Sequence, residues 1–512
     1  MAKVNKIDSN VTGLRYAEEA SLGVLPGTPD WIPMEPNSYS DFGGEVSKIA
    51  RNPINPSRQR KKGVSVDLDA SGGIVSDITQ TNVQSLLQGF MFADLRPKGT
   101  EIATGITIVG ASPDQYDVAS TTGLLAGSLV KGSGFVEAAN NGVNEILTVN
   151  VDASVEVLEG SLVAEVPAAD ASIRVVGHVG AASDIDVDVS GALPALSSTL
   201  LDFTTLGLIP GEWVYIGGDS AGSSFVNAVN NGFARVRSVA AGLLTFDKTS
   251  GTMVTETGTG LSIELYFGTV LKNELGTLIK RRTYQLERTL GAPDDSLPAE
   301  VQSEYLVGSV PSELTFNVPS AEKVTLDMSF VSQTIEQYTG AEGVKTGNRP
   351  SLIEADAFNT SSDFSRIKLA KVVPGDAAPV DLFAFAEEMT ITLGNNLEPN
   401  KALGYFGSFE ITAGTFEVGG SMTAYFADIT ATKAIIDNDD LTFDVHMIKQ
   451  NSGITFDMPL LSLGDGRPNV EQDQAIKLPL TMEAATGAKI DSTLDYTFLF
   501  MFWDYLPTAA EA

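Results

Sequence analysis

Apolar and polar residues alternate along many short stretches of the chain, and one such stretch occurs twice. Residues 314–319 (LTFNVP) are matched by residues 454–459 (ITFDMP). A period of two is typical of a strand with one buried and one exposed face, and proline is expected where such a strand ends. Residues 324–329 and 476–481 form a second matching pair. The pattern therefore predicts one β module that is present in two copies.

Matches upstream extend this repeat. Residues 54–56 match residues 397–399, and the glycine pair at 72–73 matches the pair at 419–420. Each glycine pair is followed by apolar residues at helical spacing, and each helical pattern is preceded by candidate capping residues. The first pattern is Val83, Leu86, Leu87, Phe90 and Met91 after Thr79 and Thr81, and the second is Ala431, Ala434 and Ile435 after Asp428 and Thr430. Because the matches are collinear, we predict one short α-helix in each copy.

A separate repeat lies between the first predicted helix and the rest of its module. Residues 135–142 (FVEAANNG) recur as residues 225–232 (FVNAVNNG), in a region rich in Gly, Ala, Ser, Val and Asp. Asn-Asn-Gly between strand-like segments indicates a turn, because Asn and Gly tolerate positive φ. We predict two small β domains, of sandwich or small-barrel type, that project from the surface of the first module.

The predicted chain is therefore mainly β, with two tandem β-sandwich or barrel modules and two inserted β domains. The expected boundaries are an extended N-terminal arm at 1–37, module 1 at 38–98 and 279–336, inserted domain A at 99–180, inserted domain B at 181–278, a linker at 337–380 and module 2 at 381–507.

Composition excludes several classes of function. The net charge of −32 argues against an outer surface that grips nucleic-acid phosphates. The chain has no cysteine, which excludes disulfides and thiolate sites, and its two histidines, His178 and His446, are few for a zinc or acid–base site. The longest mainly apolar run, residues 496–503, is too short to span a bilayer. The first residues lack the apolar core of a signal peptide, so we expect the chain to stay in the cytosol unless something else exports it.

The order of these segments resembles the tail-tube (major tail) proteins of bacteriophages with long, non-contractile tails. The resemblance covers roughly residues 35–95 and 280–505, and it rests on short motifs at 57–63, 281–288, 314–319, 324–330, 395–397 and 414–420. It implies a β-sandwich with one flanking helix, whose inner sheets join around a ring into a barrel. It also implies that the rings stack into a tube through which the genome passes. The tube would be assembled in the bacterial cytoplasm and located in the virion tail. No cofactor is expected.

Polar residues on the alternating strands are candidates for the lining of an aqueous lumen. These candidates are Ser65, Asp67, Asp69, Thr315, Asn317, Thr325, Asp327, Ser329, Glu410, Thr412, Glu417, Thr455 and Asp457. A lumen of carboxylates and hydroxyls would repel phosphates over a short range and let DNA slide without specific binding. The alternative is an ordinary antiparallel sheet whose polar face meets bulk solvent.

Three segments are candidates for contacts between stacked rings. They are the basic loop with Arg58, Arg60, Lys61 and Lys62, the loop with Asp294 and Asp295 that only the first copy carries, and the N-terminal arm with Trp31. If relatives with one module form six-membered rings, a chain with two modules should form a trimer with pseudo-sixfold symmetry; a hexamer is the alternative. Further expected partners are the tape measure inside the tube and the tip and terminator proteins at its ends.

Other functions have weaker support in the sequence. A glycosidase would need two carboxylates beside a cleft with aromatic residues, but Trp31, Trp213 and Trp503 lie in unrelated segments. Residues 437–440 (DNDD) resemble the start of a calcium loop, but Thr442 takes the place of the glycine such a loop needs. An adhesin built of β repeats, which would bind a host glycan or protein, is the remaining alternative. We therefore predict a structural protein without catalytic, metal-binding or cofactor-binding residues.

Overall fold

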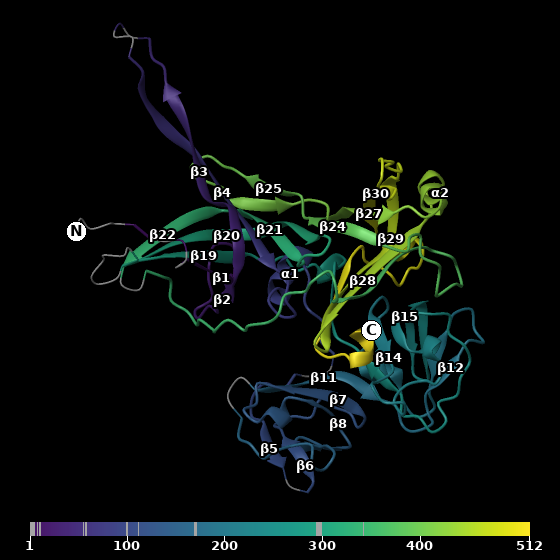
Figure 1. Cartoon of the computed structure of the whole chain (residues 1–512). Helices are drawn as coiled ribbons and strands as arrows, with labels where there is room; N and C mark the ends of the chain where they lie inside the picture. Colours follow the sequence, from purple (N-terminus) through teal and green to yellow (C-terminus); the bar gives the residue numbers. More distant parts are fainter. Residues whose placement is uncertain are drawn as a thin grey trace.

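The computed structural model of the chain describes residues 6–7, 9, 12–54, 56, 59–98, 101–110, 112–167, 171–292, 300–340 and 343–511. The described residues are mainly β-strand and include two α-helices, which confirms the mainly β fold class. The two modules lie beside each other, and the inserted region lies below them in Figure 1.

Both modules contain the same series of elements in the same order. Module 1 consists of β1 (Gly13–Glu18), β3 (Pro36–Arg51), β4 (Lys61–Asp77), α1 (Gln84–Met91), β19 (Tyr284–Gly291), β20 (Val301–Val318), β21 (Thr325–Ser332) and β22 (Thr334–Gly340). Module 2 consists of β23 (Phe364–Lys371), β24 (Ala386–Gly394), β27 (Glu417–Tyr425), α2 (Thr430–Ile436), β28 (Leu441–Lys449), β29 (Ser452–Asp465), β30 (Lys477–Ala485) and β31 (Leu499–Trp503). Equivalent strands also have equivalent partners, since β21 pairs with β4 and β20 just as β30 pairs with β27 and β29.

The modules are joined by a direct strand pair. Residues 313–318 of β20 pair antiparallel with residues 389–394 of β24. Eight of the described strands therefore form one path, β3–β4–β21–β20–β24–β27–β30–β29, which we call the polar sheet. Asn395, which follows β24, reinforces the junction by donating hydrogen bonds of 3.0 Å to the carbonyls of Phe90 and Pro311 in module 1.

The repeated glycines have a packing function in this sheet. A Cβ atom on Gly73 would lie 2.7 Å from the carbonyl oxygen of Ser40, and one on Gly420 would lie 2.1 Å from that of Thr390. Both glycines thus allow the neighbouring hairpin strand to approach closely. The matching hexamers, in contrast, are not equivalent in structure. Residues 314–319 lie in the half of β20 that pairs with β21, whereas residues 454–459 lie in the half of β29 that pairs with β28 and β31.

The two helices form close to their predicted positions. Leu86, Leu87, Phe90 and Met91 of α1 are buried in the module core, as are Ala431 and Ala434 of α2. Before α1, the backbone N–H of Thr79 donates to Asn82 Oδ1, and the N–H of Asn82 donates to Thr79 Oγ1. Thr79 therefore contributes to the start of the helix together with Asn82 rather than with Thr81.

The inserted region contains two further sheets. Its strands are β5 (Thr107–Gly110), β6 (Asp114–Asp117), β7 (Ser128–Ser133), β8 (Val143–Glu145), β9 (Thr148–Asn150), β10 (Ser154–Glu156), β11 (Ser172–Val179), β12 (Asp186–Asp188), β13 (Ala195–Ser197), β14 (Trp213–Ile216), β15 (Gly232–Ala240), β16 (Leu243–Thr249), β17 (Glu264–Tyr266) and β18 (Thr269–Lys272). Strands β5, β6, β10 and β9 form one sheet, and the other joins β7, β8 and β11 to β12–β17. Inserted domains A and B therefore share a sheet, and β18 at the end of domain B pairs with β31 of module 2.

The repeated Asn-Asn-Gly motif stabilises a loop in each insert through side-chain hydrogen bonds. In the first copy, Asn141 Oδ1 accepts from the N–H of Phe135 at 2.9 Å and Asn141 Nδ2 donates back to its carbonyl at 2.7 Å. Asn231 makes the same pair of bonds with Phe225. A glutamate about 25 residues later, Glu165 or Glu256, accepts the loop N–H groups and the amide of the preceding asparagine. The repeated motif therefore has a structural function.

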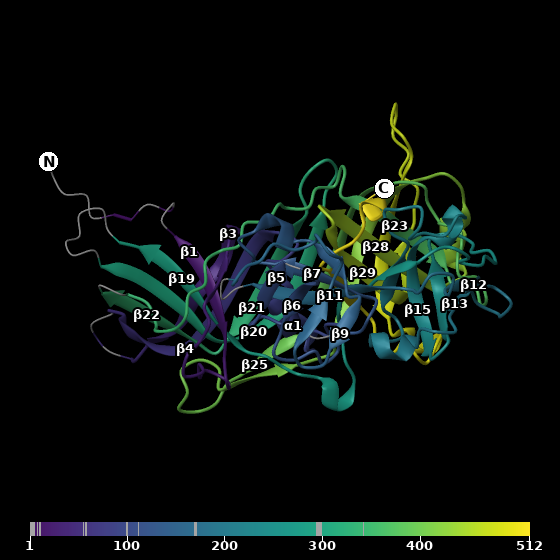
Figure 2. The ribbon, with the colours of Figure 1, turned by 90° about the horizontal axis from the view of Figure 1, so that it is seen from below.

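The inserts pack against module 2, although they leave the chain from module 1. The burial of both faces of strand β31 explains why its sequence is apolar throughout. Phe498, Phe500 and Phe502 belong to the module core, whereas Leu499, Met501 and Trp503 belong to the core of the inserted region. The prediction that the inserts project from module 1 is therefore wrong. Figure 1 shows the inserted region below β28 of module 2, and Figure 2 shows the molecule from that side.

The N-terminal segment is part of module 1. Strand β1 pairs with β19, and β2 (Ile32–Met34) pairs with β1. Trp31 is completely buried, packs against Tyr305 at a centroid distance of 5.6 Å, and donates from Nε1 to the carbonyl of Thr346 at 3.2 Å. The prediction of an extended arm whose Trp31 contacts another ring is therefore wrong.

Candidate functional site

One face of the polar sheet is hydrophobic and the other carries small polar and acidic side chains. Leu314, Phe316, Leu326 and Ile391 on the inner face are buried in the core. On the opposite face, paired positions on five neighbouring strands carry Thr325, Asn317, Thr390, Ser421 and Thr481. The hydroxyls of Thr390 and Ser421 lie 2.8 Å apart, and those of Thr315 and Thr392 lie 3.2 Å apart, so hydrogen bonds continue across the junction between modules. The result is one polar surface that spans both modules.

Acidic residues predominate among the charged groups on this face. Exposed carboxylates are carried by Asp69, Glu313, Asp327, Glu388, Glu417 and Glu483. Nearby lysines pair with acids: Lys323 donates to Asp77 at 2.8 Å, and Lys401 forms ion pairs with Asp67 and Asp69. These Lys401 contacts lower the pKa of Asp67, so the carboxylate stays charged. Around the junction of the two modules, the described residues of this face therefore present mainly hydroxyls and carboxylates, and Lys323 and Lys401 beside it are paired.

The structure places most of the candidate lumen residues on this face. Asp67, Asp69, Thr315, Asn317, Thr325, Asp327, Ser329 and Glu417 lie on it and are exposed or partly exposed. Ser65 is exposed on the part of the β3–β4 hairpin that extends beyond the sheet. Glu410 and Thr412 are exposed on a separate hairpin formed by β25 (Leu397–Asn400) and β26 (Glu410–Ala413), so the structure does not bring them together with the others.

Thr455 and Asp457 were wrongly predicted to face a lumen, because both are completely buried under the inserts. Asp457 accepts two hydrogen bonds of 3.1 Å from Arg235 of β15 and one of 2.7 Å from Tyr496. Thr455 Oγ1 accepts from Trp503 Nε1 at 2.8 Å and lies 2.7 Å from Nδ1 of His446. Thr455 and Asp457 are therefore polar because they belong to an interface between domains of the chain. Sequence reasoning missed this interface because Arg235, the partner of Asp457, is more than 200 residues away.

A buried cluster of charges joins the inserts to module 2. Lys248 of β16 forms an ion pair with Asp444 of β28, and Asp444 also accepts from Arg366 Nε at 2.5 Å. Burial by itself would raise the pKa of Asp444, but Arg366 and Lys248 hold it well below its usual range. Burial lowers the pKa of Lys248 to about 8 and that of His446 to about 4. His446 is therefore neutral at pH 7 and stacks on Phe233 at a centroid distance of 4.0 Å.

Of the remaining candidates for contacts between stacked rings, some are exposed and the others lie outside the described residues. Arg60, Lys61 and Lys62 are exposed at the end of the β3–β4 hairpin, which extends far from the rest of the molecule in Figure 1. Arg58, Asp294 and Asp295 lie outside the described residues.

Within the described ranges, no group of three or more His, Asp or Glu side chains is placed to hold a metal ion. No helix in the described part of the chain is long and apolar enough to cross a membrane.

A protein-family model described as phage tail tube protein matches residues 9–484. The match includes module 1, the inserted region, the linker and most of module 2, and it therefore covers nearly all of the chain. No curated protein matches the sequence.

Replacing Asp457 should test the buried charge cluster. We expect Asp457→Ala to lower the free energy of unfolding by about 3–5 kcal/mol, because Arg235 would remain buried without one of its carboxylates. Asp327→Ala, on the exposed face of the polar sheet, is the matched control and should change it by less than about 0.5 kcal/mol. Chemical denaturation measures the free energy of unfolding of both variants. Equal losses in the two variants would contradict the role of Asp457 in the buried charge cluster.

Protonation of His446 should make stability depend on pH. The unfolded chain takes up this proton below its ordinary pKa of 6.5, whereas the folded chain does so only near 4, so stability is lost as pH falls from 6.5 to 4. Over this range we expect the wild-type protein to lose about 3 kcal/mol more than His446→Gln. Denaturation curves at pH 6.5 and 4 provide the test, and parallel losses in both proteins would contradict it.

Proposed function

Because the chain belongs to the phage tail tube protein family, we propose that it is the tube subunit of a long, non-contractile tail and that its polar sheet lines the lumen. The continuity of this sheet across both modules is the observation that carries the proposal. One chain supplies eight neighbouring strands with a polar face, and three chains would close a ring of six modules with pseudo-sixfold symmetry. Such rings would stack into a tube that conducts DNA.

The free edges of the polar sheet favour closure with further copies of the chain. At one end, β3 pairs only with β4 among the described strands, and at the other end residues 462–465 of β29 pair only with β30. Open strand edges expose unpaired backbone groups and promote association. The two edge strands, β29 and β3, are equivalent to the two strands that pair at the junction inside the chain. Strand β29 is equivalent to β20, and β3 is equivalent to β24. The junction within one chain is therefore a template for the junction between chains.

The template also predicts a register. Glu313 pairs with Gly394 at the internal junction. The pairing of β29 with β30 shows that Gly464 occupies in β29 the position that Glu313 occupies in β20. The pairing of β3 with β4 shows that Glu45 occupies in β3 the position that Gly394 occupies in β24. We thus expect Gly464 of one subunit to lie opposite Glu45 of the next.

The charge of the proposed lining suits passage rather than binding of DNA. Carboxylates on the polar face repel phosphates, and this repulsion is screened over about 8 Å at physiological salt. Specific or tight binding would require unpaired lysines or arginines. Lys323 and Lys401 beside the face are instead paired with Asp77 and with Asp67 and Asp69, and Lys48 lies on the projecting part of the β3–β4 hairpin.

The β3–β4 hairpin is the best candidate for contact between stacked rings. Its tip carries Arg60, Lys61 and Lys62, which suit an acidic surface on another ring of this strongly acidic chain. The equivalent connection in module 2 forms the β25–β26 hairpin, which folds back onto module 1 through Lys401. Its loop exposes Leu403, Tyr405 and Phe406, which provide an apolar surface for a neighbouring subunit.

The inserted domains would decorate the outside of the tube. They pack on β28, β31 and the first half of β29, and the buried side chains on that surface point away from the polar face. The ion pairs Arg235–Asp457 and Lys248–Asp444 anchor them there, so each module 2 would carry one rigid protrusion.

Engineered cysteines test the proposed ring, since the natural chain has none. We expect a double variant with Glu45→Cys and Gly464→Cys to form disulfides between subunits under oxidising conditions. On a non-reducing gel, closed rings should produce species of up to three chains and no more. A ladder that continues to six chains would replace the trimer with a hexamer.

The matched control places the second cysteine at Thr390, which is already covered by β20 and β27 within the chain. Glu45→Cys with Thr390→Cys should leave assembled tubes uncrosslinked. Equal crosslinking of both double variants, or none in either while tubes are visible by electron microscopy, would contradict the proposed lateral pairing.

Reversing the charge of the hairpin tip tests its role in stacking. We expect the variant with Arg60→Glu, Lys61→Glu and Lys62→Glu to form rings but shorter or fewer tubes, because the tip would then repel an acidic neighbour. Tube length in negative-stain micrographs at low salt is the measurement. The control is Lys433→Glu, which reverses an exposed charge of module 2 that forms no ion pair among the described residues, and it should assemble normally. Equal tube lengths for wild type and the tip variant would refute this role.

A further inference from the structure

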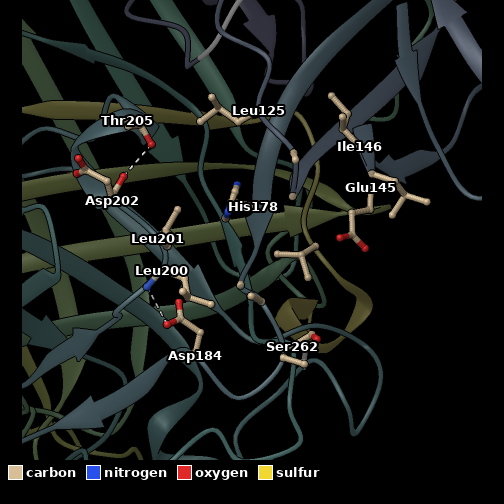
Figure 3. A pocket seen from close by; sticks show the side chains of 17 residues that line it. Leu125, Glu145, Ile146, His178, Asp184, Leu200, Leu201, Asp202, Thr205 and Ser262 are labelled. Atoms are coloured by element: carbon tan, nitrogen blue, oxygen red, sulfur yellow. Dashed lines mark hydrogen bonds between the residues drawn. The ribbon is translucent and has the colours of Figure 1, made fainter. Parts of the chain in front are cut away.

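A cavity of about 620 Å³ lies at the seam between inserted domains A and B. Domain A contributes the residues before β7, at the end of β8 and at the end of β11. Domain B contributes Ala181, Ala182 and Asp184, and residues 200–202 together with Thr205 of the 3₁₀ helix η3 (Phe203–Leu206). The shared sheet fixes this seam, because Val179 of β11 pairs with Glu264 of β17. Figure 3 shows side chains of both domains around the cavity.

The cavity contains a buried histidine without a partner. His178 is only 5% exposed, and its Nδ1 is completely shielded with no hydrogen-bond partner among the described residues. Its backbone is held between Ser128 of β7 and Leu265 of β17, so the ring has a defined position. Burial lowers its pKa to about 4, and the ring is therefore neutral at pH 7. A neutral imidazole has one ring nitrogen that accepts a hydrogen bond, and burying an acceptor without a partner is costly.

The charged residues that line the cavity are all acidic. They are Glu145, Asp184 and Asp202, and the lining includes no lysine or arginine. Asp184 is already occupied by Ser198, Thr199 and Leu200. Glu145 makes no ion pair among the described residues, and burial together with the nearby charge of Glu264 raises its pKa. Glu145 and Asp202 lie on either side of His178 in Figure 3. Asp202 accepts from the N–H and the hydroxyl of Thr204. Glu145 is therefore the lining carboxylate that has no hydrogen-bond donor among the described residues and can accept from a cation.

The walls between these polar groups are aliphatic. Leu125, Ile146, Leu200 and Leu201 line the cavity, and no aromatic side chain does so. Such walls suit methylene groups, whereas stacking of a flat ring or a sugar face has no platform. The lining thus combines an apolar surface, an acidic rim and a hydrogen-bond acceptor.

We propose that this cavity binds a primary alkylammonium group. The methylene chain would lie against Leu125, Leu200 and Leu201. The ammonium group would donate to the Glu145 carboxylate and to His178 Nε2, since Nδ1 is shielded and Nε2 is not. Two sources share this chemistry: a free aliphatic diamine or polyamine, and the side chain of a lysine on another protein. The site is independent of the proposed lumen, since it lies in the inserted domains.

Binding of 1,5-diaminopentane to the full-length protein tests the proposal. Saturation-transfer NMR and calorimetry at pH 7.5 should show saturable binding, whereas 1,5-pentanediol, which has the same length but no charge, should not bind. Glu145→Gln should weaken binding about 3- to 10-fold through the loss of a partly exposed ion pair. Leu200→Arg should weaken it at least as much, because it places a competing cation on an exposed wall position.

The control variant is Glu159→Gln, which removes one exposed carboxylate from domain A outside the cavity. It should bind the diamine like the wild-type protein. The proposal is overturned if the diol binds as tightly as the diamine, if no saturable binding occurs, or if Glu145→Gln and Glu159→Gln behave alike. Tighter binding of Nα-acetyl-lysine methylamide than of the diamine would assign the site to a protein lysine, and the reverse order would assign it to a free polyamine.

Discussion

The antiparallel pair between β20 and β24 is the interaction on which the architecture depends. It joins the backbones of two modules into one sheet, so their polar faces form one surface and their hydrophobic faces share one core. A backbone ladder fixes both distance and register, whereas a contact between side chains would allow the modules to rotate against each other. The same pair leaves two complementary free edges, and this arrangement allows the sheet to continue into further copies of the chain.

Module 2 shows how one strand can serve two different environments. The second half of β29 belongs to the polar sheet, whereas its first half carries Thr455 and Asp457 beneath the inserts. Buried ions lose hydration, and they are tolerated there because each has partners: Asp457 meets Arg235, and Asp444 meets Arg366 and Lys248. Removing one partner is costly, so the cluster holds the inserts in one orientation on the module.

Several features of the fold and the candidate site were predictable from local signals. The spacing around Leu86 and Phe90 correctly indicated α1, and alternation correctly placed Thr315 and Asp327 on the polar side of their strands. The same alternation failed for Asp457, and the arm with Trp31 was misjudged, because their partners are distant in sequence. The cavity around His178 had no sequence signal, since its residues come from separate segments of two domains.

The duplication, the strands and helices, the loops built on Asn-Asn-Gly and the acidic, cysteine-free composition all follow from the amino-acid sequence without reference to the fold. These properties depend on residue periodicity and short-range hydrogen bonds, which act between neighbours along the chain. Which polar face meets water and which is covered by another domain depends on the folded chain, because covering a face requires long-range contacts. Thr315 and Thr455 show this difference, since they occupy the same place in matching hexamers. Thr315 is partly exposed beside Thr392, whereas Thr455 is completely buried beside His446.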